Sequence, residues 1–191
     1  MASTRDALLD AAFDAVVAGD WARTRMSDVA TAAGVSRQTL YNSFGSKEAL
    51  ATALALREAE VFLAGAVAVA RASEGDPGDQ AYATTLWVLR KAQDNPLVKA
   101  ALTDDAAGLL PFLTTRSEGI LMLFRDGMVA VLAERWPHLD RDEASWVAEM
   151  TVRLTVSHLV VPTESAETTA GHVAILVRRL LAGCSPTEHT P

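Results

Sequence analysis

A short stretch between residues 36 and 44 carries polar side chains of the types that contact nucleic acid. They are Arg37, Gln38, Tyr41 and Asn42. Arginine can hold guanine through two hydrogen bonds, glutamine or asparagine can do the same with adenine, and hydroxyl groups reach phosphates. Leu40 and Phe44 are four residues apart, so a helix here would turn its apolar side inward. The pattern therefore predicts a helix whose polar edge faces the bases of a DNA duplex.

Local signals predict how that helix is positioned. Ser36 can cap its first turn, because a serine hydroxyl accepts a backbone N–H from the third helical residue. Gly34 tolerates positive φ, as the residue just past a preceding helix must. That preceding helix would carry Val29, Ala30 and Ala33 on one face, with Val35 filling the angle between the two helices. Residues 27–44 thus have the layout of a helix-turn-helix.

The run AGVSRQTLYNSFGSKEAL, residues 33–50, resembles the recognition segment of the TetR (tetracycline-repressor-like) family of bacterial transcription regulators. An opening amphipathic helix over residues 4–18, ended by Gly19, belongs to the same pattern. The resemblance covers about the first fifty residues. It implies an all-α fold with a three-helix DNA-binding head at residues 1–46. A larger helical effector-binding and dimerisation body would follow at residues 47–183, with a flexible tail at residues 184–191.

The motif match assigns DNA contacts residue by residue. It assigns phosphate contacts to Thr24, Thr39, Tyr41 and Lys47, whereas the side-chain types make Arg37, Gln38 and Asn42 the base readers. The alternative for any one of these residues is that it only decorates a solvated helix face.

Two positions depart from the family pattern. Gln38 stands where a small residue is common, and it can add a contact or tilt the helix. Arg25 stands where many relatives place the Thr or Ser that caps the second helix, so the reciprocal bond with Asp28 is not expected. Either Thr24 or Ser27 caps instead, or Arg25 itself reaches a phosphate.

Composition and charge set limits on the function. The 191 residues carry a net charge of −7, but residues 1–50 hold five bases against six acids, a net charge of −1. Four of those five bases fall between residues 23 and 47, and local charge decides phosphate binding because fields are screened within about 10 Å. No recognisable catalytic motif, cofactor motif or metal-ligand spacing occurs, and the single Cys184 has no partner for a disulfide. We expect a cytoplasmic protein that is not an enzyme, without cofactor, metal or membrane span.

The rest of the chain predicts helices and negligible strand. A long helix without a breaker should run from Lys47 to about residue 72 and link head to body, with Ser46 as its cap. A polar loop is expected at residues 73–80. Further helices are expected near residues 81–94, 97–102, 114–134, 142–160 and 166–182. The pair Asp126–Gly127 lies inside a helical pattern and indicates a kink or a close-packing site.

The last two predicted helices carry apolar stripes that need covering. The residues are Trp146, Met150 and Leu154 in one, and Val173, Leu176, Val177, Leu180 and Leu181 in the other. Spacing alone leaves two readings open: these stripes pack on the chain's own core, or they meet a second copy. The resemblance favours a homodimer, since TetR-like proteins pair through their last two long helices.

Bulky residues in the body could line an effector pocket. They are Trp87, Phe112, Met122, Phe124, Trp146, Met150 and His158. Ordinary core packing is the alternative for each of them. Together with the resemblance, these observations predict a homodimeric repressor that binds a palindromic operator and is released by a small, apolar effector. The alternative is a constitutive dimeric DNA-binding or architectural protein without an effector.

Overall fold

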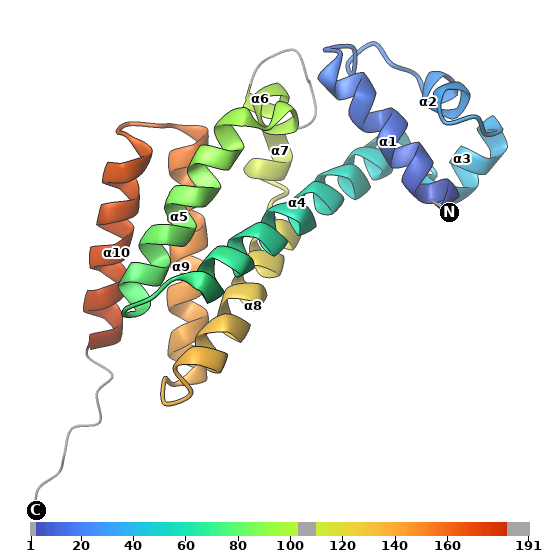
Figure 1. The fold of residues 1–191 in the computed structure, drawn as a ribbon. Coiled ribbons are helices and arrows are strands. Elements are labelled where there is room, and N and C mark those ends of the chain that lie inside the picture. Colours follow the sequence, from blue (N-terminus) through green and yellow to red (C-terminus); the bar gives the residue numbers. More distant parts are fainter. Residues whose placement is uncertain (1–2, 103–109, 183–191) are drawn as a thin grey trace, which may run out of the picture. The chain divides into compact units, whose positions relative to one another are not determined.

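The computed structural model describes residues 3–102 and 110–182, and these residues form helices without any strand (Figure 1). The helices are α1 (Thr4–Val17), α2 (Met26–Ala32), α3 (Arg37–Phe44), α4 (Lys47–Ala72), α5 (Pro77–Asp94), α6 (Pro96–Leu102), α7 (Leu110–Leu113), α8 (Glu118–Arg135), α9 (Arg141–Val160) and α10 (Ala166–Ala182). The all-α prediction is confirmed. The predicted tail, including Cys184, lies outside the described residues.

The chain divides into two compact units. The first unit contains residues up to Ala59 together with residues 92–117, and the second contains residues 60–91 and those from Glu118 onward. The short helix α6, expected in the body, therefore packs in the first unit, where it contacts α1.

The first unit is built around leucines that are fully buried. Leu8 of α1, Leu40 of α3, and Leu50 and Leu54 of α4 have no exposed surface. Burying a leucine side chain contributes about 1.5–3 kcal/mol, so the burial of Leu40 favours one orientation of α3 in the head. A capping box starts α1, because Ser3 and Asp6 each accept the other's backbone N–H at 3.1 Å.

The second unit contains the remainder of α4 together with α5, α8, α9 and α10. Its core joins Val147 of α9 to one face of α10, formed by Val173, Val177 and Leu181. Ion pairs tie α4 to α8 through Arg71 and Glu134, α5 to α10 through Arg90 and Glu167, and the start of α5 to Arg178.

Two glycines let helices of the second unit approach closely. A Cβ on Gly65 of α4 would lie 2.1 Å from a ring carbon of Trp87, which meets Phe62 edge-on at 6.2 Å. A Cβ on Gly127 of α8 would lie 2.6 Å from Leu63 of α4. The helix α8 continues through Gly127, so the prediction of a close-packing site at this position is confirmed.

Some predicted boundaries were wrong. The loop expected at residues 73–80 ends at Asp76, because Pro77 occupies the first helical position, where its missing N–H costs nothing. The carboxylates of Asp76 and Asp79 then accept each other's backbone N–H at 2.9 and 3.1 Å. In addition, α8 begins at Glu118 rather than near residue 114, after a turn in which the N–H of Arg116 donates to the carbonyl of Pro111 at 2.6 Å.

No helix in the described part of the chain is both long and apolar enough to cross a membrane.

Candidate functional site

The helix α3 begins at the cap that the sequence indicated, and a glycine ends it. The Ser36 hydroxyl accepts the backbone N–H of Thr39 at 3.0 Å and caps the helix, as predicted. Gly34 before the helix has φ 69° and Gly45 after it has φ 73°, a conformation that favours glycine. Leu40, on the inner side of α3, is fully buried, so α3 has a fixed orientation in the head.

The outer side of α3 carries a polar edge. The amide nitrogen of Gln38 donates to the Asn42 side-chain oxygen at 2.8 Å, and both residues are exposed. The guanidinium of Arg37 lies 5.4 Å from the ring centre of Tyr41, which is 37% exposed. The Gln38 bond leaves the Asn42 NH₂ group available to donate, so the pair offers both donors and an acceptor to a ligand. All four residues are exposed.

The start of α2 differs from the family pattern in the way the sequence suggested, with one correction. Arg25 occupies the N-cap position, and no side-chain capping bond forms there. Neither of the expected substitutes caps, because Thr24 donates to the Asp20 carbonyl at 2.8 Å and Ser27 lies 3.4 Å from Asp28. Asp28 nevertheless accepts the Arg25 backbone N–H at 2.9 Å, so half of the reciprocal arrangement survives. Arg25 itself is exposed.

Lys47 occupies a different environment from the other predicted DNA contacts. Its ammonium nitrogen donates to the carbonyls of Trp21 at 2.6 Å and Thr24 at 2.7 Å, and it lies 4.8 Å from the ring centre of Trp21. Burial lowers the pKa of Lys47. Sequence reasoning did not find Trp21, because 26 residues separate it from Lys47 and no local pattern joins them.

One further contact of the head was also missed. The Arg5 guanidinium lies 4.5 Å from the ring centre of Phe44, so α1 covers the end of α3 with a cation over an aromatic face. Arg5 was counted among the bases of the head, but nothing in the spacing of α1 indicates its aromatic partner.

The predicted effector residues, apart from Phe112, are scattered along the second unit. Trp87 is wedged over Gly65, while Met122, Phe124 and Met150 are partly buried. His158 faces the Leu154 carbonyl with Nδ1 at 2.9 Å. Phe112 lies outside the described side chains.

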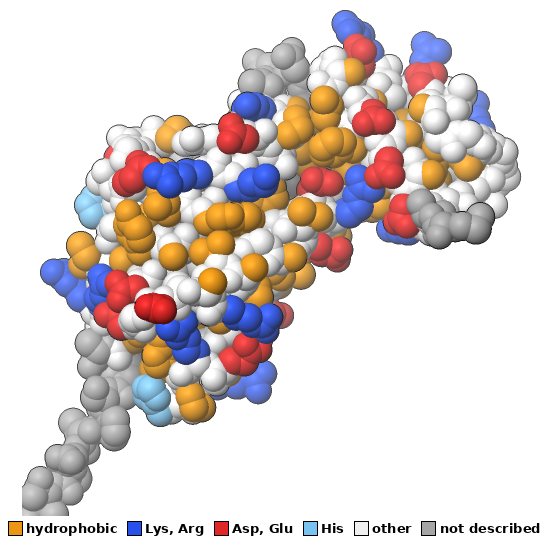
Figure 2. Space-filling model, viewed as in Figure 1, with side chains coloured by type: hydrophobic (Ala, Val, Ile, Leu, Met, Phe, Trp, Pro, Cys, Tyr) orange, Lys and Arg blue, Asp and Glu red, His pale blue; other side chains and the backbone are white. Residues whose placement is uncertain are grey.

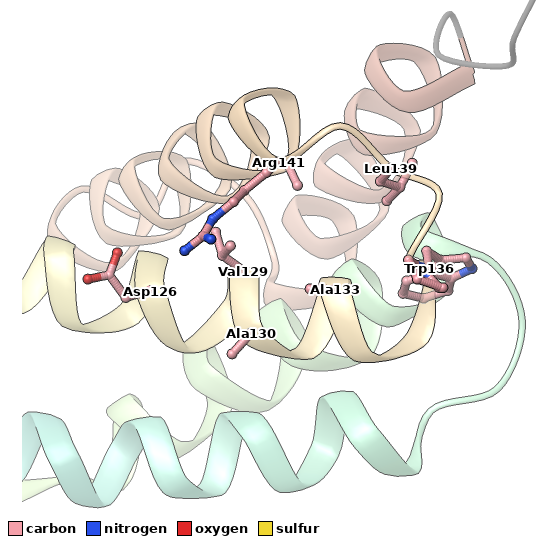
Figure 3. A pocket seen from close by; sticks show the side chains of 9 residues that line it. Asp126, Val129, Ala130, Ala133, Trp136, Leu139 and Arg141 are labelled. Carbon is pink, nitrogen blue, oxygen red and sulfur yellow. The ribbon is translucent and has the colours of Figure 1, made fainter.

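A hollow of about 610 Å³ lies beside the turn between α8 and α9, and Figure 3 shows its side chains. Trp136 and Leu139 form its apolar end, and Arg141 reaches back across α8 near Val129. None of the predicted effector residues lines this hollow.

The predicted dimer residues fall into two groups. Val173, Val177 and Leu181 are at most 8% exposed and pack on Val147, so they cannot offer surface to a second copy. These three side chains are covered by the chain's own core. Leu154 and Leu180 pack at the margin of the same cluster, and Leu176 and Met150 are partly buried.

The helices α9 and α10 also carry large apolar side chains that are exposed. Trp146 is 51% exposed and Ile175 is 48% exposed. Ile175 was not predicted, because it lies off the apolar stripe that the spacing marks. On the face drawn in Figure 2, hydrophobic side chains of the helical body are interspersed with charged ones.

Comparisons with known proteins agree with this architecture. Residues 8–54 match the family described as bacterial regulatory proteins, tetR family, and residues 76–179 match the bacterial tetracyclin repressor C-terminal domain. The HTH-type transcriptional regulator AlkX of Mycobacterium tuberculosis is 32% identical over 174 residues, which make up 91% of this chain and 82% of that protein.

Solved structures show the same likeness. The TetR family repressor AlkX from Dietzia sp., a protein implicated in biodegradation of n-alkanes, is 28% identical with a TM-score of 0.78, over 96% of this chain and 98% of that one. The repressor QsdR of R. erythropolis is 21% identical with a TM-score of 0.68, over 98% of each chain, which is a likeness of fold alone.

Proposed function

Because the chain belongs to the TetR family of bacterial transcriptional regulators, we propose that it is a homodimeric repressor that reads a palindromic operator with α3 of each head. One observation carries the proposal. The polar edge formed by Arg37, Gln38 and Asn42 is exposed, while Leu40 beneath it is fully buried. A guanidinium and two carboxamides are suited to guanine and adenine in the major groove.

Residues around this edge would position the head on the phosphates. Thr39 and Tyr41 flank the base readers on α3, and Thr24 and Arg25 lie just before α2. Such contacts fix the register of a protein on the duplex without reading sequence. Arg25 suits this role because it is exposed and caps nothing with its side chain.

A palindrome requires a two-fold protein, and the outer sides of α9 and α10 are our proposed dimer surface. Trp146 and Ile175 are its exposed anchors, with Met150 and Leu176 beside them. Large apolar side chains that are half-exposed in one chain gain free energy when a second copy covers the exposed part.

We further propose that a small apolar molecule releases the operator. The AlkX relative from Dietzia is implicated in n-alkane biodegradation, so alkane-like molecules are the first candidates for this chain. The effector residues remain those predicted from the sequence, led by Trp87, Met122 and Phe124. Release requires that the ligand prefer the arrangement of heads that does not fit DNA, because equal affinity for both arrangements shifts nothing.

The experiment has a DNA arm and an effector arm. In the DNA arm, the wild-type chain and a variant with Arg37, Gln38 and Asn42 all changed to Ala are titrated against operator and random duplexes by fluorescence anisotropy. The variant should lose its preference for the operator and keep its weak affinity for random DNA. Unchanged preference would refute the role of α3.

In the effector arm, n-alkanes of increasing length are added to the wild-type chain and to its operator complex. Thermal stabilisation of the protein together with loss of anisotropy is expected for some lengths. A chain that no member stabilises, and that keeps its operator, would instead be the constitutive DNA-binding protein.

A further inference from the structure

We propose that Lys47 is a positioning residue that holds the turn between α1 and α2 in place for DNA binding, and that it does not contact a phosphate. This inference deepens the proposed function and depends on the head binding DNA. It replaces the phosphate contact that the motif match assigned to this lysine.

The three donors of the Lys47 ammonium group all have acceptors within the head. The nitrogen lies 2.6 Å from the Trp21 carbonyl, 2.7 Å from the Thr24 carbonyl and 3.4 Å from the Ala22 carbonyl. The indole ring of Trp21 lies below it, with its ring centre 4.8 Å away. An ammonium group has three N–H donors, so none is left for a phosphate oxygen in this arrangement.

The carbonyls need this donor because the chain leaves helical structure there. Gly19, at φ 73°, ends α1, and the next helix begins only at Met26. Within the turn, the backbone N–H of Thr24 is shared between the Asp20 carbonyl at 2.9 Å and the Trp21 carbonyl at 3.2 Å, and its hydroxyl donates to the Asp20 carbonyl at 2.8 Å. Lys47, in the first turn of α4, gives the Trp21 carbonyl a second and shorter hydrogen bond and also donates to the Thr24 carbonyl.

This arrangement has a direct consequence for DNA binding. Thr24 and Arg25 are proposed to approach the phosphates, and they sit at the end of the segment that Lys47 holds. The same segment sets where α2 begins, and α2 packs on α3. Losing the ammonium group should therefore weaken binding through the geometry of the turn and not through a lost charge contact.

Salt dependence separates these two causes. The logarithm of the binding constant falls linearly with the logarithm of the salt concentration. Losing one phosphate contact reduces the magnitude of this slope by about 0.9 per head, whereas a misplaced turn need not change the slope. Lys47→Met keeps the length of the side chain and removes only the donors and the charge. Lys91→Met, at an exposed position of α5, is the matched control.

The test uses the full chain at a temperature at which circular dichroism shows each variant to be folded. For Lys47→Met we expect about tenfold weaker operator binding, an unchanged salt slope, and about tenfold faster amide exchange in residues 20–26 of the free protein. Lys91→Met should change none of these. Because amide exchange is measured without DNA, it reports on the lysine even if the chain proves to have no operator.

Two results would overturn the proposal. A slope that falls by about 0.9 per head with unchanged amide exchange would make Lys47 a phosphate contact. Faster exchange with unchanged operator affinity would make it a structural residue without influence on binding. If Lys47→Met does not fold, NMR of the wild-type Lys47 ammonium group decides: the account predicts no scalar coupling to ³¹P in the operator complex, and such a coupling would contradict it.

Discussion

The hydrogen bond between Gln38 and Asn42 predicts that the two residues read DNA as a unit. The bond is 2.8 Å long and joins exposed residues four apart on α3, so Gln38 fixes which way the Asn42 carboxamide points. In the free protein such a pair contributes only about 0.2–0.5 kcal/mol. In the complex its value is larger, because an oriented carboxamide making two good hydrogen bonds to a base discriminates by about 1–3 kcal/mol.

The perturbation is a double-mutant cycle of Gln38→Ala and Asn42→Ala. We expect Asn42→Ala to cost about 2 kcal/mol per head on the operator, roughly 30-fold, and less than about 0.5 kcal/mol on a random duplex. Gln38→Ala should cost about 1–2 kcal/mol, since it loses its own contact and loosens Asn42. The double variant should then lose less than the sum of the two, by at least about 0.5 kcal/mol.

The assay is fluorescence anisotropy with both duplexes at one fixed salt concentration. Losses that add within about 0.3 kcal/mol would refute the coupling. An equal loss on operator and random DNA for Asn42→Ala would remove this residue from the base readers altogether.

Three further predictions concern the second unit. Gly127→Ala should lower the free energy of unfolding by about 1–3 kcal/mol, because the new Cβ would lie 2.6 Å from Leu63. Gly171→Ala is the control: nothing lies near its Cβ position, so this variant should be neutral or stabilising. Equal effects of the two variants in urea unfolding would contradict this. Trp146→Glu should shift the proposed dimer toward monomer in analytical ultracentrifugation while helicity is kept. If the wild-type chain is a dimer and the variant remains one, this residue is excluded from the interface. The hydrogen bond from Arg71 of α4 holds the pKa of Glu134 below the ordinary 4.5. The stabilising contribution of Glu134 is therefore present above pH 4.5 and is lost as the pH falls through the folded-state pKa. The melting temperature of Glu134→Gln should depend less on pH in acid than that of the wild-type chain, and an identical pH profile would refute the link.

Features fixed by neighbouring residues could be predicted from the sequence. The start of α3 at Arg37 follows from the Ser36 cap, and the turn before it follows from Gly34, whose positive φ the structure confirms. The start of α5 was misplaced because Pro77 and Gly78 resemble a turn, although proline also suits the first position of a helix.

Features that depend on tertiary approach could not be predicted. Helical spacing identified Val173 and Val177 as one apolar face of α10, but spacing does not say whether the chain itself or a second copy covers that face. The environment of Lys47 depends on the turn at residues 21–24, which is brought beside α4 only when the head folds. Motif matching assigned this lysine a phosphate contact, and only the folded head shows the carbonyls on which our proposed positioning role is based.

The central claim, that the polar edge of α3 reads sequence, is tested most directly by selecting duplexes from a random pool with the wild-type chain. The account predicts enrichment of a palindrome whose half-sites lie about one helical turn of DNA or a multiple of it apart, and loss of that enrichment when Arg37, Gln38 and Asn42 are changed to Ala. The same palindrome enriched by both proteins, or no enrichment by either, would contradict it.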